Sequence, residues 1–422
     1  MNPIPLDLLP ETATVHHGRL RIGGCDVADL VAEFGSPLFI YDEQHLIDRC
    51  TEAVAAFGEG VAYASKAFLC KAMARLAYEA GMDIDVATGG ELFVALAGGV
   101  PADRIVMHGN NKTDTEITMA LNAGVGRIVV DSFDEMDRLD RLVPDAAHAP
   151  TVLVRVNPGI EAHTHEYLRT GITDSKFGFP LARDLAAQAI ERARSSESMV
   201  YRGIHAHIGS QVFDVTSYGK AMGALAPFIE ASGAAEVSVG GGLGVGYLSG
   251  EKAPTISEWA EAIHRVARAH GIDARITAEP GRSIVAKAAV TAYTVGTIKD
   301  IPGVRTYLAV DGGMSDNPRP VLYGSGYEAF LVRDVAAPRE RSFRIVGKHC
   351  ESGDVIIHDA ALPTDVSVGD IIGTPVTGAY SHSMGSNYNK VLRPAVVFVL
   401  DGSPRLVVER ETYQDLVAHD VG

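Results

Sequence analysis

Cysteine is scarce in this chain of 422 residues. There are four cysteines, Cys25, Cys50, Cys70 and Cys350, and no two of them have the CxxC spacing. A structural zinc site needs closely spaced thiols and a disulfide scaffold needs a dense cysteine framework, so the sequence predicts no metal site and no scaffold of this kind. A few unclustered cysteines are typical of a protein from a reducing compartment.

Long apolar runs and excess basic charge are missing as well. The chain has no run of about 18 apolar residues, the length needed to span a membrane. The first residues, MNPIPLDLLPE, lack the basic head and apolar stretch of a signal peptide. Lys and Arg number 37 against 53 Asp and Glu, a formal net charge of -16, which repels phosphate backbones and anionic lipids. We therefore expect a cytoplasmic protein that binds neither nucleic acid nor membranes.

A repeated alternation of two patterns fills residues 60–285. Short β-branched, apolar runs end in polar residues or glycine, and Ala/Leu-rich amphipathic stretches follow them. The runs lie at 61–67, 82–88, 103–109, 126–132, 151–157, 203–209, 236–242 and 275–281. Candidate helices between them include 69–80, 91–98, 113–123, 181–194, 217–231 and 257–270. Eight such units favour a closed (β/α)8 TIM-like barrel, with a doubly wound open sheet as the structural alternative.

The pattern changes from about residue 286 onward. Short runs such as VTAYTVGTI and AVVFVL are bounded by Gly, Pro and Asp, and LDGSPRL is typical of a hairpin connection. We therefore expect an α/β plus β protein in three parts. Residues 1–35 form a segment that pairs with the β domain, 36–285 form the barrel, and 286–422 form a mainly β sandwich or barrel.

The carboxyl ends of the predicted barrel strands are where such barrels carry their reactive groups. Lys66, in AYASKAF, lies among apolar residues, which favour the neutral amine that forms a Schiff base. The glycines of GGGLG (240–244) could bind a phosphate through backbone N–H groups, and Ser210 could add a hydroxyl. Taken alone, Lys66 is better interpreted as a surface lysine, and the glycines could equally form a flexible turn.

Two further residues complete a possible cofactor site. Glu279, in AEPGRS, could hydrogen-bond the ring nitrogen of pyridoxal 5'-phosphate, and His207 could stack on the ring. Each has a simpler interpretation alone, as a turn carboxylate and as a core histidine. Together with Lys66 and the glycine loop they supply every part that this cofactor needs, and the combination indicates a pyridoxal-phosphate enzyme.

The order of motifs along the chain is similar to that of a known family. The motifs are AYASKA, DVATGGEL, HGNNK, VNPGIEAHTHEYLRTG, DSKFG, HIGSQ, GGGLG, EPGRS, NPRPVLYG, CESGD, GAYS and SNYN. They resemble the bacterial diaminopimelate decarboxylases, which have the alanine-racemase-like fold III of pyridoxal-phosphate enzymes. The resemblance runs from about residue 20 to the closing RETYQDLVAHDVG, nearly the whole chain.

The resemblance implies a set of cofactor-binding residues. It makes Lys66 the Schiff-base lysine, with His207 on the ring face and Glu279 at the ring nitrogen. The full set that it implies is Lys66, Asp85, His207, Ser210, Gly241, Gly242, Glu279, Gly281, Arg282 and Tyr380. Ser65 stands where many members have valine, beside the lysine and without replacing it.

The resemblance also implies substrate contacts and an assembly. The substrate-binding residues would be Arg282, Arg319, Tyr323, Glu351 and Tyr380. Cys350, in CESGD, resembles the proton donor that the family supplies from a partner subunit, which implies a homodimer with shared active sites. Outside that motif, a free cysteine such as Cys350 would be interpreted as a half-buried filler.

The activity that this resemblance implies is the decarboxylation of meso-2,6-diaminopimelate to L-lysine, the last step of lysine biosynthesis. Arg282 and Arg319 suit a substrate with a second carboxylate, because guanidinium groups pair with carboxylates in bidentate fashion. The alternative is a related decarboxylase of ornithine, arginine or carboxynorspermidine. A non-catalytic, cofactor-binding homologue is a further alternative, which the presence of Lys66 and Cys350 opposes.

Overall fold

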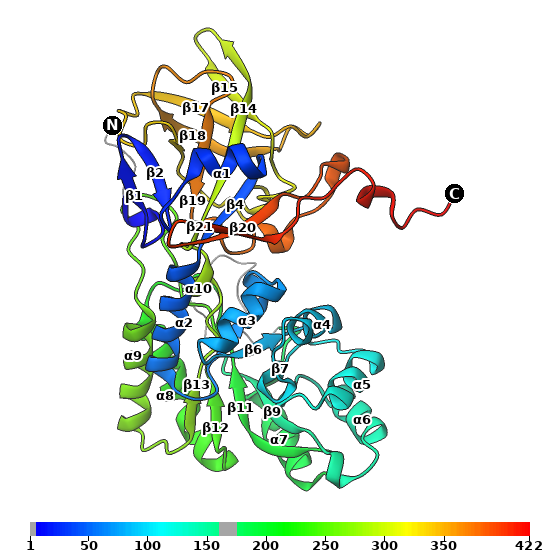
Figure 1. Ribbon diagram of the computed structural model, residues 1–422. Coiled ribbons are helices and arrows are strands. Elements are labelled where there is room, and N and C mark those ends of the chain that lie inside the picture. The colour runs from blue at the N-terminus through cyan, green and yellow to red at the C-terminus, as the bar shows by residue number, and fades with distance from the viewer. Residues whose placement is uncertain (1–5, 160–174) are drawn as a thin grey trace. The chain divides into compact units, whose positions relative to one another are not determined.

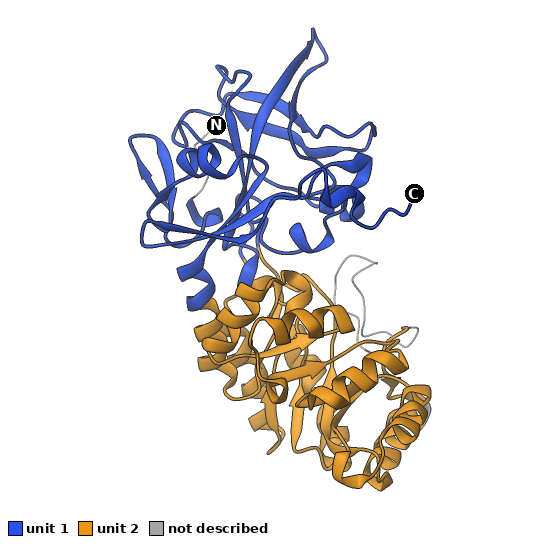
Figure 2. Ribbon diagram, turned by 45° about the vertical axis from the view of Figure 1, so that its right-hand side comes forward, with its two compact units in different colours: residues 1–48, 246–252, 284–422 blue, residues 49–245, 253–283 orange. Residues whose placement is uncertain are grey.

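The computed structural model describes residues 6–159 and 175–422. The chain folds into two compact units (Figure 2). One is β-rich and comprises residues 1–48, 246–252 and 284–422, and the other is the barrel unit, residues 49–245 and 253–283.

The barrel unit is built on eight parallel strands that neighbour one another in chain order (Figure 1). They are β5 (Ala62–Ala64), β6 (Asp83–Val86), β7 (Ile105–Met107), β8 (Arg127–Val130), β9 (Thr151–Asn157), β11 (Val200–Ala206), β12 (Glu236–Ser238) and β13 (Arg275–Thr277). A short strand, β10 (Phe179–Pro180), adds to β9. The backbone closes the ring, because Ala62 N–H donates to Ala278 O at 3.0 Å and Ala64 N–H donates to Pro280 O at 3.1 Å. The predicted (β/α)8 barrel is confirmed.

Helices follow most of these strands and surround them (Figure 1). They are α2 (Glu43–Phe57), α3 (Lys71–Glu79), α4 (Gly89–Ala97), α5 (Asp114–Ala123), α6 (Phe133–Leu142), α7 (Leu185–Ser195), α8 (Val215–Ser232), α9 (Ile256–Ala269) and α10 (Arg282–Val285). Capping boxes at Thr113 and Thr255 start α5 and α9. Helix α7 begins later than the sequence pattern suggested, because Asp184 has a left-handed φ of 57° after a short 3-10 turn.

The barrel interior and the helix layer have separate apolar cores. Ala62, Val106, Val129 and Leu153 form a buried cluster, and each comes from a different strand. Trp259 of α9 is fully buried outside the strands, with its ring centroid 4.9 Å from that of Phe57. Packing on both sides of the strands holds their carboxyl ends in place, and the polar residues of the barrel lie at these ends.

The β-rich unit contains a sheet that the change of pattern at residue 286 had indicated. Its strands are β4 (Leu38–Asp42), β14 (Ala289–Ile301), β15 (Arg305–Val310), β16 (Phe330–Leu331), β17 (Arg341–Val346), β18 (Val355–Leu362), β19 (Ile371–Pro375), β20 (Ala395–Leu400) and β21 (Ser403–Val408). The main path runs β18-β17-β15-β14-β4-β20-β21, and β19 pairs with β14 and β16. A short helix, α11 (Arg319–Tyr323), lies in the same unit.

The N-terminal segment forms a small sheet of its own. Strands β1 (Thr14–His16), β2 (Arg19–Ile22) and β3 (Cys25–Asp26) pair with one another and lead into α1 (Val27–Phe34). The segment joins the rest of its unit through single backbone bonds, such as Val335 N–H to Gly18 O at 2.8 Å. Residues 36–48 lie in the same compact unit, since β4 pairs with β14 and β20. The division into domains at residues 35 and 285 stays a prediction.

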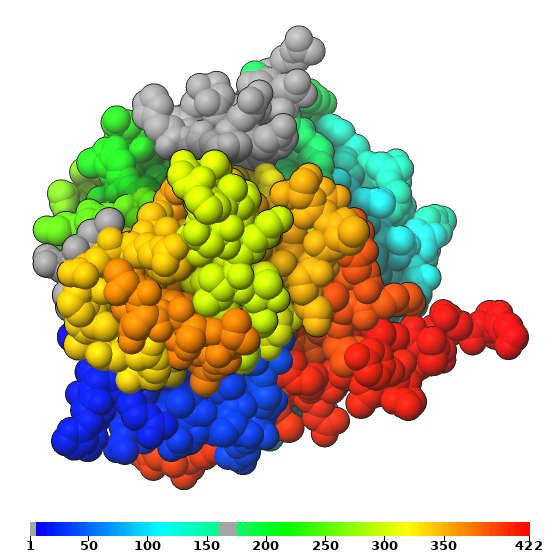
Figure 3. All heavy atoms as spheres, turned by 90° about the horizontal axis from the view of Figure 1, so that it is seen from above, coloured from blue at the N-terminus to red at the C-terminus, as the bar shows by residue number. Residues whose placement is uncertain are grey.

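The end of the chain forms a hairpin and then a tail. The expected hairpin in LDGSPRL joins β20 to β21, with Leu400 opposite Ser403 and positive φ angles at Asp401 and Gly402. Positive φ at both central residues is the geometry that suits a two-residue connection. Beyond β21 the chain runs out from the β-rich unit (Figure 1 and Figure 3), and Tyr413 is 75% exposed there.

Candidate active site

Lys66 stands at the mouth of the barrel. It lies in a 3-10 turn (Ser65–Ala67) directly after β5, and its side chain is exposed. Its charge acts on Asp85 of β6, on Glu91 of α4 and on His207 after β11. Burial raises the pKa values of Asp85 and Glu91. The carboxyl ends of the strands thus bring the lysine together with acids and a histidine, as expected of a barrel of this kind.

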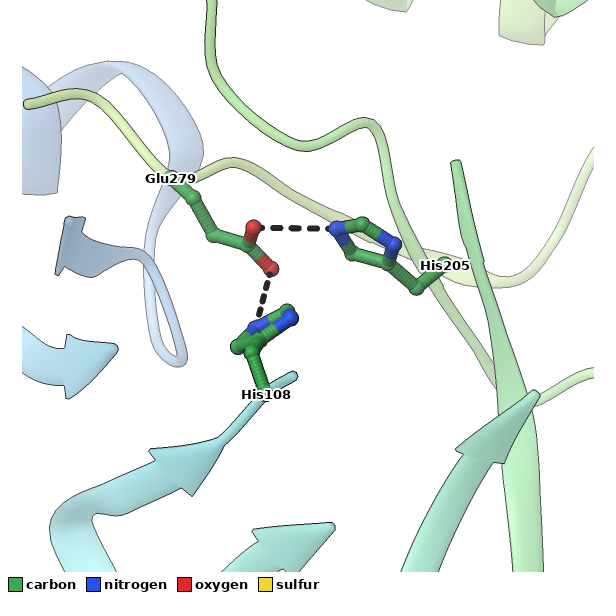
Figure 4. A group of neighbouring side chains, drawn as sticks. All are labelled: His108, His205 and Glu279. Carbon is green, nitrogen blue, oxygen red and sulfur yellow. Dashed lines mark hydrogen bonds and ion pairs between the residues drawn. The ribbon is translucent and has the colours of Figure 1, made fainter. Parts of the chain in front are cut away.

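Glu279 follows β13 and is the centre of a buried polar network (Figure 4). His205 Nε2 lies 3.0 Å from Glu279 Oε2, and His108 Nε2 lies 3.3 Å from Oε1. Ser238 donates its hydroxyl to Oε1 at 2.7 Å. Burial alone would raise the pKa of Glu279, but His205 and His108 outweigh it and hold the pKa well below the ordinary value. Glu279 is therefore an anion inside the barrel.

The pKa values of the two histidines shift in opposite directions. Burial lowers the pKa of His205 to about 4, so its ring is neutral near pH 7. Burial opposes the charge of His108 too, but Asp85 and Glu279 outweigh it and raise the pKa of His108. One ring nitrogen of His108, one of His205 and a carboxylate oxygen of Glu279 lie within 4.8 Å of one another, close enough for them to bind one metal ion. His205 Nε2 hydrogen-bonds Glu279 and His108 Nε2 forms an ion pair with it, so we interpret the group as a polar network centred on the carboxylate.

His207 is partly exposed and its ring is fixed by the backbone. The N–H of Gly241 donates to His207 Nδ1 at 3.1 Å, which leaves the proton of a neutral ring on Nε2. Burial, followed by the charge of Lys66, lowers the pKa of His207 well below the ordinary value. A neutral, oriented imidazole can offer its face to an aromatic ring, which is the role predicted for it.

The glycine loop after β12 lies so close to neighbouring backbone that side chains are excluded. A Cβ at Gly241 would meet Glu279 O at 2.3 Å, and one at Gly242, whose φ is +103°, would meet Gly209 O at 2.1 Å. A Cβ at Gly281 would stand 2.8 Å from Ala64 O. Because no side chain fits at Gly242 or Gly281, no Cβ covers the backbone N–H groups there, and such N–H groups can approach an anion closely.

A hydroxyl and a guanidinium also contact each other in the barrel unit. Arg282 Nη2 donates to Ser210 Oγ at 3.1 Å, and both residues were predicted to bind cofactor. Together with the backbone N–H groups of Gly242 and Gly281 they provide a cation, a hydroxyl and N–H donors, the donor set that a phosphate ester needs. With Lys66, His207 and the anionic Glu279, the residues present fit pyridoxal phosphate.

Arg319 is the first residue of α11 in the β-rich unit and is 5% exposed. Its Nη1 donates to Tyr327 OH and its Nη2 to Ser325 Oγ, each at 3.1 Å. Among the described residues, no carboxylate forms an ion pair with it. Tyr323, at the other end of α11, is partly exposed. A buried cation held only by neutral groups is suited to an anionic ligand.

The CESGD loop presents two of the predicted residues at the surface of the β-rich unit. Cys350 and Glu351 are exposed, and the N–H of Cys350 donates to Asn389 Oδ1 at 2.9 Å. Asp354 is buried and accepts from the backbone N–H of His349 at 2.9 Å and pairs with its Nδ1 at 2.8 Å. Asp354 thus anchors the loop from inside, a role that the sequence reasoning did not assign.

Tyr380 lies in a strained turn after β19. Its φ is 62°, and Val376 in the same turn has a φ of 60°. Bulky residues rarely adopt the left-handed region, so surrounding bonds must hold the turn. Gly378 N–H donates to Ala286 O at 3.0 Å, and Tyr41 OH donates to Gly378 O at 2.8 Å.

The structure thus divides the predicted site residues between the two units. The barrel unit brings together Lys66, Asp85, His207, Ser210, Gly241, Gly242, Glu279, Gly281 and Arg282, while the β-rich unit carries Arg319, Tyr323, Cys350, Glu351 and Tyr380. The motif VNPGIEAHTHEYLRTG lies outside the described residues from position 160 onward.

Sequence reasoning named no role for three partners of the site, His108, His205 and Ser238. A signal for His205 was available, because it stands two residues before His207 and alternate residues of a strand share one face. The HGNNK motif drew attention to the strand end at His108, but nothing in it indicated a contact with Glu279. Ser238 gave no signal.

No helix in the parts of the chain that the structure describes is both long and apolar enough to cross a membrane.

Comparisons with known proteins agree with this geometry. Residues 43–286 match the model of the family described as pyridoxal-dependent decarboxylase, pyridoxal binding domain. Diaminopimelate decarboxylase of Bacillus subtilis (strain 168) is 44% identical over 421 residues, covering 96% of this chain and 96% of the relative. The enzyme of that name from Mycobacterium tuberculosis is also 44% identical, covering 96% of this chain and 95% of the relative. The crystal structure of the M. jannaschii diaminopimelate decarboxylase in co-complex with L-lysine is similar, with a TM-score of 0.90, 32% identity and 98% of each chain covered.

Proposed function

The chain belongs to the diaminopimelate decarboxylases, within the pyridoxal-dependent decarboxylases, and from this membership we propose how its residues serve the reaction. It is a pyridoxal-phosphate-dependent carboxy-lyase that converts meso-2,6-diaminopimelate to L-lysine and carbon dioxide, the last step of lysine biosynthesis. We assign the steps of that reaction to side chains of the barrel unit and of the β-rich unit.

The barrel unit holds the cofactor in this proposal. When bound, pyridoxal phosphate supplies an electron sink for the electron pair left by the breaking Cα–carboxylate bond. Lys66 would hold it through the side-chain amine, and His207 would lie against its ring. Glu279, a buried anion, favours a proton on the ring nitrogen opposite it. Asp85 interacts electrostatically with Lys66 and is assigned to the support of the lysine.

We assign the phosphate of the cofactor to the glycine loop after β12 and to the turn at Gly281. Gly241 would leave room for its approach, the backbone N–H groups of Gly242 and Gly281 would donate to it, and Ser210 and Arg282 would add a hydroxyl and a cation.

The β-rich unit supplies the substrate contacts. The observation that carries the substrate assignment is the buried guanidinium of Arg319, which has only neutral hydrogen-bond partners among the described residues. Diaminopimelate has a second carboxylate that can pair with it, whereas ornithine and arginine end in cations. Tyr323, Glu351 and Tyr380 complete the substrate contacts, together with Arg282 of the barrel unit.

Cys350 is proposed as the proton donor. After carbon dioxide leaves, the α-carbon must take up a proton on one face, and a positioned thiol can provide it. Cys350 is exposed, and the N–H of Cys350 is fixed by Asn389, so the loop presents the thiol outward. The bonds from His349 to Asp354 hold the loop, and with it Cys350, in this position.

We further propose a homodimer in which Cys350 and Glu351 serve the site of the partner subunit. Exposed apolar side chains on the tail of the β-rich unit support a protein partner, because Tyr413 is 75% and Val417 57% exposed. Twofold pairing is the commonest closed assembly and gives two equivalent sites. A cytoplasmic location is part of the proposal, since all four cysteines are free thiols, as in a reducing compartment.

The direct test is an assay of lysine release from meso-diaminopimelate, with ornithine and arginine as competing substrates. We expect lysine as the product and little loss of rate with either competitor in excess. Faster decarboxylation of ornithine than of diaminopimelate would contradict the substrate assignment and favour a related basic amino-acid decarboxylase.

A further inference from the structure

Ser238 links the glycine loop to Glu279. Its Oγ accepts the N–H of Gly240 at 3.2 Å and stands 2.7 Å from Glu279 Oε1. The N–H of Glu279 donates back to Gly240 O at 2.8 Å. A hydroxyl has a single hydrogen, and here an N–H already occupies Oγ as an acceptor, so that hydrogen is directed to the carboxylate. The loop proposed to bind phosphate and the acid proposed to face the ring nitrogen are therefore one connected structure.

His205 contacts the other oxygen of the same carboxylate. Its Nε2 lies 3.0 Å from Glu279 Oε2, and the side chain is almost fully buried. The Nδ1 atom is buried and has no hydrogen-bond partner among the residues that the structure describes. A neutral ring in this position carries its proton on Nε2, because that is where an acceptor stands. His205 is then a donor to Glu279.

These contacts leave the carboxylate with little freedom. A carboxylate offers about four acceptor positions. His205 and Ser238 each hydrogen-bond one oxygen of Glu279, and His108 Nε2 forms an ion pair with Oε1 at 3.3 Å. Two hydrogen-bond donors and a neighbouring imidazole favour the ionised form of this carboxylate over the protonated form.

We propose that His205 and Ser238 are positioning residues, which orient the carboxylate of Glu279 and keep it anionic so that the cofactor's ring nitrogen stays protonated. Both residues are buried and act through Glu279. The inference rests on the cofactor role proposed above for Glu279 and goes beyond it by naming the groups that make that role possible.

Other charged or titratable groups also act on Glu279. They come from β6, the end of β7, β9 and the end of β11, and they are Asp85, His108, Arg155 and His207. None of these four residues is altered in the experiment below, so a changed protonation of the ring nitrogen in a variant reports the loss of the donor that was replaced.

The experiment uses enzyme reconstituted with pyridoxal phosphate that carries 15N in the ring, because the 15N chemical shift reports whether the nitrogen is protonated. We expect a protonated nitrogen in the wild type between about pH 6 and pH 9. Ser238→Ala and His205→Leu each remove one donor, and in each the nitrogen should lose its proton at lower pH than in the wild type. In both variants kcat should fall on the order of 10-fold while KM changes little.

Two further variants test whether the donor, and not the volume of the side chain, is responsible. Ser238→Thr keeps the hydroxyl and His205→Gln keeps an N–H donor. The 15N titrations of both should therefore lie closer to that of the wild type than those of Ser238→Ala and His205→Leu. Matched controls are Ser232→Ala, which removes a buried hydroxyl bonded to Ile229 O, and His264→Leu, a histidine of α9 near Ala56 O. Both controls should give the wild-type 15N titration. If one of Ser238→Ala and His205→Leu fails to fold, the titration of the other decides.

Glu279→Gln separates the two levels of the proposal. If its ring nitrogen titrates as in the wild type, the cofactor role of Glu279 is wrong and this inference falls with it. If Glu279→Gln changes the titration while Ser238→Ala and His205→Leu do not, the role of Glu279 stands and the inference about His205 and Ser238 is overturned.

Discussion

The ring of Tyr247 lies against the guanidinium of Arg319, with Arg319 Cζ 4.3 Å from the ring centroid. Tyr247 belongs to residues 246–252, which interrupt the barrel unit in the sequence and pack in the β-rich unit. With Tyr327 OH on Nη1, this ring holds a buried cation without neutralising it. The arrangement favours an anionic ligand.

Replacement of Arg319 should therefore weaken substrate binding. Arg319→Ala removes one charge-assisted pair, and we expect KM for diaminopimelate to rise on the order of 10-fold or more, with a smaller change in kcat. Arg319→Lys should recover part of the loss, since it keeps the charge without the bidentate geometry. Arg333→Ala, which removes an exposed arginine paired with Asp370, is the control. Steady-state kinetics in which Arg319→Ala matches Arg333→Ala would contradict the assignment.

Lys66 should be the residue that carries the cofactor. Lys66→Ala should have no detectable turnover while its circular dichroism spectrum stays that of the wild type. Lys71→Ala, which alters an exposed lysine at the start of α3, should keep activity. Reduction of the holoenzyme with borohydride followed by peptide mapping should label Lys66, and a label on any other lysine would show that the assignment is wrong.

Gly242 should tolerate no side chain. In Gly242→Ala the new Cβ would meet Gly209 O at 2.1 Å, so the loop must move and cofactor affinity should fall. Gly271→Ala is the matched control, because Gly271 also has a positive φ, +66°, and nothing lies within 4 Å of its Cβ position. Both changes share a conformational cost of about 1 kcal/mol, and only the first carries the clash. Equal cofactor dissociation constants for the two variants, measured by fluorescence, would contradict this account of the loop.

Complementation should reveal shared active sites. Lys66→Ala and Cys350→Ala chains are each expected to be inactive, but a mixed dimer would contain one site with both changes and one with neither. After random subunit exchange, activity should recover toward about a quarter of the wild type, because half of the dimers are mixed. If exchange is demonstrated by mass labelling and no activity returns, both residues serve a site in the same chain.

Asp316 should make the folded chain less stable as pH rises. It is buried, with Tyr293 OH donating to it at 2.6 Å, and burial raises its pKa from 3.8 to about 7. Below about pH 4 both the folded and the unfolded chain hold the proton, whereas between about pH 4 and pH 7 only the folded chain does, so stability falls across that window.

Asp316→Asn removes this titration. The free energy of unfolding of the variant minus that of the wild type should therefore increase, by up to about 4 kcal/mol, as pH rises from about 4 to 7. Urea denaturation at both pH values measures the difference, with Asp365→Asn, a largely exposed acid paired with Arg333, as the control. A difference that stays constant with pH would mean that Asp316 is ionised in the folded protein at low pH.

Much of the fold could be predicted because its signals are local. The eight barrel strands appear in the sequence as short apolar runs, and the turn at Asp401 and Gly402 as a DG pair between such runs. The start of α7 was predicted too early, since the pattern extends through Asp184 while the backbone there turns left-handed. Periodicity describes which face is apolar and does not record the φ angle of one residue.

The sequence by itself determined the barrel, the change to β structure, and the residue types of a pyridoxal-phosphate site, because strand periodicity and motif order are carried by neighbouring residues. Only the tertiary structure decided the partners of those residues. The carboxylate of Glu279 is held by His205 and Ser238, which lie on other strands, and Arg319 is held by Tyr247, which follows the barrel's glycine loop in the chain. Closing a parallel barrel brings the ends of all its strands to one mouth, whatever their separation in sequence, and no local pattern records which side chains then meet.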